Sequence, residues 1–131
     1  SQASRYLDDA RVVGNVTLVS AIVENAADAG DLRQLATDLK GRLAARNDTA
    51  VIVLGSSNGD KLPFVVAATP AAVEAGVKSG DLVKLVGGYV NGRGGGKPDM
   101  AQGSGSAAGI DDVSAAFRTA FDAVADALAA Y

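Results

Sequence analysis

The sequence contains no histidine and no cysteine among its 131 residues, and it has no tryptophan. Histidine is the commonest general base near neutral pH, and histidine and cysteine are the commonest zinc ligands. Nucleophilic schemes of the Ser/His/Asp and Cys/His types are therefore excluded within this chain, and so are disulfides. Any metal ion would have to be held by carboxylates alone.

Long apolar runs are missing as well. No stretch approaches the roughly 18 consecutive apolar residues that a membrane-spanning helix needs, and the first five residues lack the charged-then-apolar pattern of a signal peptide. We therefore expect no membrane partner and a cytoplasmic location. Hydrophobic residues make up 48% of the chain and charged residues 21%, which is ordinary for one globular domain.

The net charge is −3, whereas domains that bind nucleic acid are usually basic. The charge is unevenly spread, because residues 77–105 hold four cations against two carboxylates and the tail after them is acidic. The four cations are Lys78, Lys84, Arg93 and Lys97. This distribution favours a small basic contact surface over an autonomous, high-affinity RNA-binding domain.

Hydrophobic periodicity predicts the elements of the first half. Residues 5–13 are expected to form one or two helical turns, and the β-branched run at 16–23 predicts a strand buried on both faces. Asp31 is expected to cap an amphipathic helix whose apolar stripe is Leu32, Leu35, Ala36, Leu39 and Leu43. The cations of this helix lie mostly off the stripe, which favours a solvated face over contact with RNA; they are Arg33, Lys40, Arg42 and Arg46.

Strands are predicted at 50–54 and 61–68, joined by a turn in which Asn58-Gly59 is typical of a hairpin. Ser79 is expected to cap a helix that runs to about Tyr89 and is followed by a glycine loop, a short edge strand at 99–102 and a flexible turn at 103–109. A last helix is predicted over 112–131. The sequence thus predicts a single-domain α/β sandwich, with helices packed on a mixed β-sheet and a glycine-rich loop after the penultimate helix.

Residues 90–105 read VNGRGGGKPDMAQGSG, with three consecutive glycines between Arg93 and Lys97. Glycine is costly to order, so such a run indicates positive φ or the close approach of a ligand or another backbone. Two cations beside exposed peptide N–H groups also form a candidate anion-binding site. The alternative is a surface turn that only reverses the chain.

Two nucleotide-binding motifs are set aside. Pro98 stands where a P-loop needs Ser or Thr, and the G-x-G-x-x-A pattern at 103–108 has no second strand after its helix to complete a βαβ unit. Phe117 and Phe121 lie in an apolar stripe, which indicates core packing. Tyr89 lies close to the glycines, and the sequence allows two roles for it: stacking on a base or covering the core.

Residues 92–103, GRGGGKPDMAQG, resemble a signature near the C-terminus of alanyl-tRNA synthetases. There a DHH-associated domain has a segment that reads GGG, then Arg or Lys, then Pro-Asp-Met-Ala-Gln. A looser resemblance covers nearly the whole chain. It implies that residues 1–14 are the tail end of a preceding helical segment and that 15–131 form the globular DHH-associated domain.

The resemblance implies a noncatalytic domain that binds tRNA(Ala), at the elbow where the D and T loops meet, and that links aminoacylation with editing of mischarged tRNA in a parent ligase. No cofactor is expected in this chain, because ATP, Mg²⁺ and Zn²⁺ would be bound by other domains of the ligase. Those other domains are expected as further partners of this one. The expected RNA-binding residues are Lys84, Arg93, Gly94, Gly95, Gly96, Lys97, Pro98, Asp99, Met100 and Gln102.

Two alternatives remain. In DHH-type phosphoesterases a domain of this kind holds the end of a nucleic acid, but those proteins place His directly after the glycines, where Lys97 stands here. A dimerisation module, forming a homodimer, is compatible with tRNA binding.

Overall fold

The computed structural model describes residues 2–24, 26 and 28–131. Its helices are α1 (Gln2–Asp8), α2 (Ala29–Ala45), α3 (Pro70–Glu74), α4 (Ser79–Gly87) and α5 (Val113–Leu128). Its strands are β1 (Arg11–Val13), β2 (Val16–Ile22), β3 (Ala50–Gly55), β4 (Lys61–Ala68), β5 (Arg93–Lys97) and β6 (Met100–Ser106). No helix in this part of the chain is long and apolar enough to cross a membrane.

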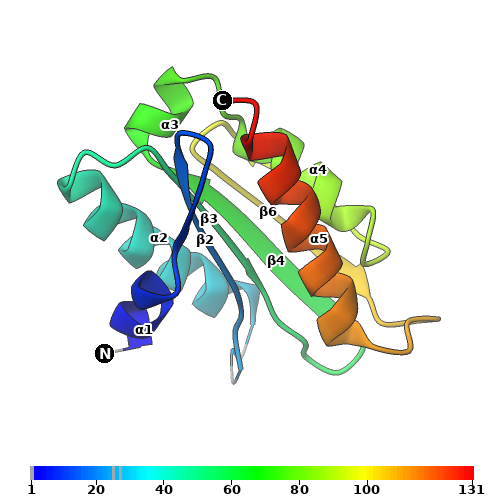
Figure 1. Cartoon of the computed structure of the whole chain (residues 1–131). Coiled ribbons are helices and arrows are strands. Elements are labelled where there is room, and N and C mark those ends of the chain that lie inside the picture. Colours follow the sequence, from blue (N-terminus) through cyan, green and yellow to red (C-terminus); the bar gives the residue numbers. More distant parts are fainter. Residues whose placement is uncertain (1, 25, 27) are drawn as a thin grey trace.

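The strands form one mixed sheet in the order β1-β2-β3-β4-β6-β5. β2 and β3 are parallel, joined by the α2 crossover, and the other pairs are antiparallel. Figure 1 shows three layers, with α1 and α2 on one side of the sheet and α4 and α5 on the other. The α/β sandwich with a mixed sheet is therefore confirmed.

Each face of the sheet has its own apolar core. Between the sheet and α2, the helix buries Leu32, Ala36, Leu39 and Leu43 against alternate residues of β3 and β4. On the opposite face Phe117, Phe121 and Leu128 of α5 pack with Val83 and Val86 of α4 over the other residues of the same strands. A strand buried on both faces needs a continuous apolar run, which β3 has, and its six residues are all buried.

Two predictions near the N-terminus are wrong in detail. Residues 11–13, predicted as helix, form β1, which pairs with β2 through the turn at Gly14 (φ 60°). The domain boundary predicted after residue 14, which lies in the turn of this hairpin, stays a prediction. The cap of α2 is Asp28 rather than Asp31: the Asp28 carboxylate accepts a hydrogen bond from the backbone N–H of Asp31, with N and Oδ1 3.0 Å apart.

The glycine segment is the main correction. It is not a loop: residues 93–97 form β5, the edge strand of the sheet, and β5 makes a hairpin with β6 across the turn at Pro98-Asp99. β6 continues to Ser106, through residues predicted as a flexible turn. Glycine disfavours strands, but it occurs in them where another backbone comes close, and α4 packs directly on β5 and β6.

The cap of α4 also differs from the prediction. Lys78 is the N-cap and Ser79 is the first helical residue, fully buried, with no partner for its hydroxyl among the described residues. The backbone N–H of Ser79 donates instead to the carbonyl of Pro98, at an N–O distance of 2.9 Å. This bond ties the start of α4 to the turn between β5 and β6.

Candidate nucleic-acid interface

The two faces of β5 differ in what covers them. Strand residues alternate between faces, and the register pairs Gly94 with Gly103 and Gly96 with Ala101 on the face that α4 covers. Arg93, Gly95 and Lys97 point to the opposite face, paired with Ser104, Gln102 and Met100. The sequence run GRGGGK therefore divides into a buried set of glycines and an outward-facing set with the cations.

The three consecutive glycines have different roles. A Cβ added at Gly94 would lie 2.5 Å from Cγ1 of Val83 and 2.5 Å from the carbonyl oxygen of Gln102, and one at Gly96 would lie 2.6 Å from Cα of Ala101. These two glycines are needed for packing. A Cβ added at Gly95 would meet nothing within 4 Å, so this residue leaves an exposed stretch of bare backbone.

A groove runs along this outward-facing surface, between the β5–β6 hairpin and α2. Its volume is about 390 Å³, and it is lined by Arg33 of α2 and by Gly95, Gly96, Lys97, Asp99, Met100, Ala101 and Gln102. The groove exists because α2 packs over β3 and β4 and leaves β6 and β5, which lie beyond them, uncovered on this side. Gln102 is exposed on the floor, and Met100 is half-buried against the α2 core.

Two cations line the groove, one on each side. Arg33 stands on the α2 side, Lys97 on the β5 side, and Arg93 extends the same strand face two residues before Gly95. Lys40 of α2 is occupied, because its Nζ lies 3.4 Å from Oδ2 of Asp99. Arg33, Arg93 and Lys97 have no ion-pair partner within the described ranges, so the groove can accept an anion.

Six of the ten predicted site residues line the groove: Gly95, Gly96, Lys97, Asp99, Met100 and Gln102. Arg93 lies on the same strand face beyond this lining, and Gly94 lies on the face that α4 covers. Lys84 lies on α4, across the sheet from the groove. Pro98 is in the hairpin turn, and its carbonyl is engaged by Ser79. Asp99 lines the groove but presents its carboxylate to Lys40, and its carbonyl accepts from the N–H of Ala68. Tyr89 is 41% exposed just past the end of α4 and does not line the groove.

Sequence reasoning missed the contribution of α2. Arg33 and Lys40 were assigned to a solvated helix face, yet they lie on the side of α2 that borders the β5–β6 hairpin. Their spacing held a signal, because residues about two turns apart lie on one side of a helix. Arg42, in contrast, pairs with Asp38 at 3.3 Å from Nε to Oδ1, the i,i+4 pair that the sequence predicts.

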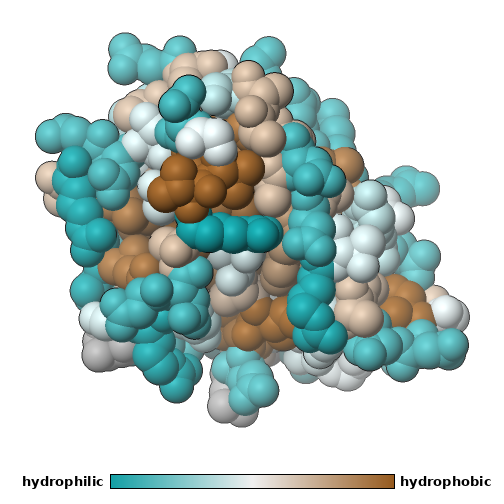
Figure 2. Space-filling view, viewed as in Figure 1, coloured by the Kyte–Doolittle hydropathy of each residue, from teal (hydrophilic) through white to brown (hydrophobic). Residues whose placement is uncertain are grey.

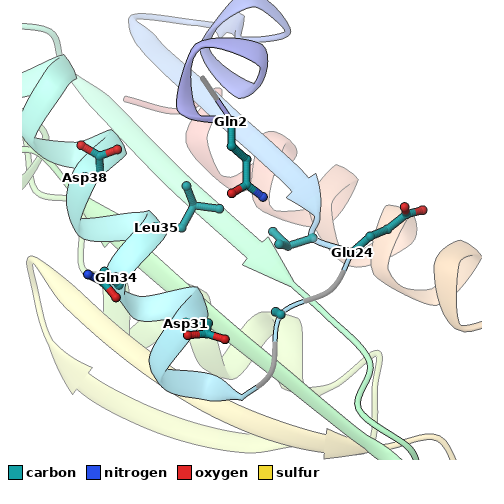
Figure 3. A pocket seen from close by; sticks show the side chains of 8 residues that line it. Gln2, Glu24, Asp31, Gln34, Leu35 and Asp38 are labelled. Carbon is teal, nitrogen blue, oxygen red and sulfur yellow. The ribbon is translucent and has the colours of Figure 1, made fainter.

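A second hollow lies between α1, α2 and the end of β2 (Figure 3), with a volume of about 530 Å³. Its lining includes Glu24, Asp31 and Asp38 beside Gln2, Gln34 and Leu35, so it is acidic and unsuited to a polyanion. No group of three carboxylates close enough to hold a metal ion occurs in the described part of the chain.

Comparisons with known proteins show the family to which the chain belongs. A family model described as the DHHA1 domain matches residues 15–126. The chain belongs to the DHHA1 domain family. It is 48% identical to an alanine–tRNA ligase from Corynebacterium glutamicum over 125 residues, which is 95% of this chain and 14% of that ligase. The chain thus spans about a seventh of the length of this curated relative.

Solved structures agree with this membership of the DHHA1 family. The C-Ala domain of alanyl-tRNA synthetase from Aquifex aeolicus superposes with a TM-score of 0.77 at 28% identity, covering 92% of this chain and 98% of that one. A pGpG-specific phosphodiesterase from Vibrio cholerae has a TM-score of 0.52 at 14% identity, covering 95% and 37%, which shows a shared fold alone. The predicted resemblance to the C-terminal domain of alanyl-tRNA synthetases is confirmed.

Proposed function

We propose that this DHHA1 domain is the noncatalytic tRNA-binding module of an alanine–tRNA ligase. The observation that carries the proposal is the groove, in which bare backbone at Gly95 lies between unpaired cations of two elements. Phosphate contacts from Arg and Lys supply most of the affinity for nucleic acid and position the ligand.

The floor of the groove suits close contact with a folded RNA. With no side chain at Gly95, a sugar or a base edge can reach the peptide groups of β5 directly, and the exposed amide of Gln102 can both donate and accept hydrogen bonds. The ligand we propose is tRNA(Ala) at its elbow. In the full ligase, holding the tRNA here would link aminoacylation with editing of mischarged tRNA, both carried out by other domains that use ATP, Mg²⁺ and Zn²⁺.

Binding of fluorescently labelled tRNA(Ala) to the chain, followed by anisotropy, tests the proposal. Gly95→Ala and the larger Gly95→Val should weaken binding in that order and leave its salt dependence unchanged, because they block approach without removing charge. Arg93→Gln and Lys97→Gln should each lower the slope of log K against log salt by about one unit. Gly88→Ala is the control for adding a Cβ. Gly88 is the C-cap of α4, outside the groove, and a Cβ there would have as its nearest neighbour the carbonyl oxygen of Leu85 at 3.5 Å, an ordinary contact.

Unchanged affinity and salt slope in a folded Arg93→Gln, Gly95→Val, Lys97→Gln triple variant would contradict tRNA binding at this groove. Circular dichroism of each variant shows whether the fold is retained. The nucleic-acid-end-binding role of DHH-type phosphoesterases predicts a different outcome, in which short oligonucleotides compete with tRNA at equal concentration.

A homodimer contact is a second candidate role. It is supported by β1, the edge strand at the other end of the sheet from β5. β1 is an open edge strand, and Val12 on it is 74% exposed. Figure 2 shows hydrophobic surface over the β1–β2 hairpin. Open edges with exposed apolar residues pair readily with another strand. Sedimentation of the chain and of Val12→Lys tests this role, since a β1 dimer should dissociate in the variant and a monomeric parent excludes it.

A further inference from the structure

α2 forms one side of the groove, although the family signature lies wholly on the β5–β6 hairpin. We propose that Arg33 of α2 binds a phosphate of the same tRNA across the groove from Lys97, which makes the interface two-sided. This inference rests on the proposed function and extends its surface to a helix more than fifty residues earlier in the chain.

The packing of α2 fixes where Arg33 stands. Its neighbour Leu32 is buried, as are Ala36 and Leu39, against Val65 and Ala67 of β4. β4 pairs directly with β6, where Ala67 is opposite Met100 and Val65 is opposite Gln102. The residues that hold α2 in place are therefore opposite the residues of the groove floor, and the position of Arg33 relative to that floor is determined by the core.

The three cations of α2 differ in whether an ion pair occupies them. Arg33 is exposed and has no ion-pair partner in the described residues. Lys40, on the same side of the helix, is bound to Asp99, and Arg42, about two and a half turns from Arg33 and on the opposite side, is bound to Asp38. Arg33 is thus the α2 cation that faces the groove with its donors available. A guanidinium also matches the bidentate geometry of phosphate.

The groove lining strengthens the case for a second cationic side. None of the described residues that line it is aromatic, so binding does not gain the stacking energy of about 1–3 kcal/mol per base that single-strand sites use. Affinity must then come from phosphate contacts and backbone approach. Arg93 and Lys97 of β5 alone would hold the RNA from one side only, whereas Arg33 contacts it from the other side.

The test compares Arg33→Gln with Arg42→Gln, which remove the same charge from opposite sides of one helix. With tRNA(Ala) as the probe, Arg33→Gln should lower the salt slope by about one unit and weaken binding several-fold at low salt, while Arg42→Gln should leave both at the parent values. The double variant Arg33→Gln, Lys97→Gln should lose about two units of slope.

Each other outcome has a definite meaning. If Arg33→Gln matches Arg42→Gln while Lys97→Gln still lowers the slope, α2 is not part of the interface, and the proposed function stands without it. If Lys97→Gln and Gly95→Val are also without effect, the proposed function itself fails. If both α2 variants lower the slope equally, the effect is the long-range field of the helix, and direct binding by Arg33 is overturned.

Discussion

Lys40 of α2 and Asp99 of the β5–β6 turn form an ion pair of 3.4 Å between Nζ and Oδ2, across 59 residues of sequence. It is one of two ion pairs that α2 makes in the described part of the chain, and it lies at the groove, whereas the Asp38–Arg42 pair lies on the other side of the helix. The pair therefore neutralises one cation next to the proposed RNA surface.

Asp99→Asn should release Lys40 and remove a carboxylate from the groove. We expect tighter tRNA binding at low salt and a salt slope steeper by up to about one unit. The loss of stability should stay below about 1 kcal/mol, because the pair is partly solvent-exposed. Asp38→Asn is the matched control. It breaks the other α2 ion pair with the same change of net charge, and equal gains in both variants would exclude a local effect of Asp99.

Adding one methyl group should destabilise the fold at Gly94 and have little effect on stability at its neighbour Gly95. Gly94→Ala should cost about 1–3 kcal/mol of unfolding free energy, because its Cβ would overlap Val83 and the backbone of Gln102. Gly95→Ala should change stability by less than about 0.5 kcal/mol, since its Cβ points into open space. Urea unfolding of both proteins measures the difference, and equal destabilisation would mean that the two faces of β5 are assigned wrongly.

Leu39→Ala tests the α2 core on which the position of Arg33 depends. Leu39 is fully buried between α2 and the sheet, so the substitution should cost about 2–5 kcal/mol. Leu35→Ala, at a half-buried position of the same stripe, should cost clearly less. A loss under about 0.5 kcal/mol at Leu39, typical of surface positions, would contradict the packing of α2.

Two buried hydroxyls should respond differently to their removal. Thr69 Oγ1 accepts from the N–H of Ala50 at 3.0 Å and donates to the carbonyl of Asp48 at 2.7 Å, so Thr69→Val should cost about 1–3 kcal/mol. Ser79 Oγ is buried without a partner among the described residues, so Ser79→Ala should be neutral or stabilising. Thermal unfolding of both variants checks this contrast, and a destabilised Ser79→Ala would show that its hydroxyl is bonded.

The isolated chain should neither charge tRNA with alanine nor deacylate mischarged tRNA. It has no His or Cys to act as nucleophile, general base or zinc ligand in the usual ways. Aminoacylation and deacylation assays on the purified chain, with full-length ligase as the positive control, measure both activities. Either reaction above the background without protein would contradict a purely binding role.

The sequence predicted those elements whose own pattern decides their structure. α2 and α5 repeat apolar residues at helical spacing, and Asn58-Gly59 separates two apolar runs, so both helices and the β3–β4 hairpin are confirmed. β5 was missed because its three glycines disfavour a strand. The close packing of α4 and β6, a tertiary effect, explains Gly94 and Gly96 but not Gly95, whose Cβ would meet no neighbour. β1 was missed because three residues are too few to show an alternating pattern.

The glycine signature located one side of the candidate site but not its shape. Arg93, Gly95, Lys97 and Gln102 share a face of the β5–β6 hairpin as a consequence of strand pairing, which could not be read from a predicted loop. Arg33 joins them only because β4 and β6 are neighbours in the sheet, with α2 packed on β4. Such a contact between distant segments depends on the whole fold, and local sequence patterns do not contain it.

The most direct test of tRNA binding at this groove is an NMR titration of the chain with tRNA(Ala), observed through its backbone amides. We predict that the signals of Arg33, Gly95, Gly96 and Gln102 shift or broaden first and together, and that added salt reverses the change. Signals of α5, and of Lys84 on the far side of the sheet, should follow only at high RNA concentration. Early changes confined to α4 and α5, or none in the groove at saturating tRNA, would contradict tRNA binding there.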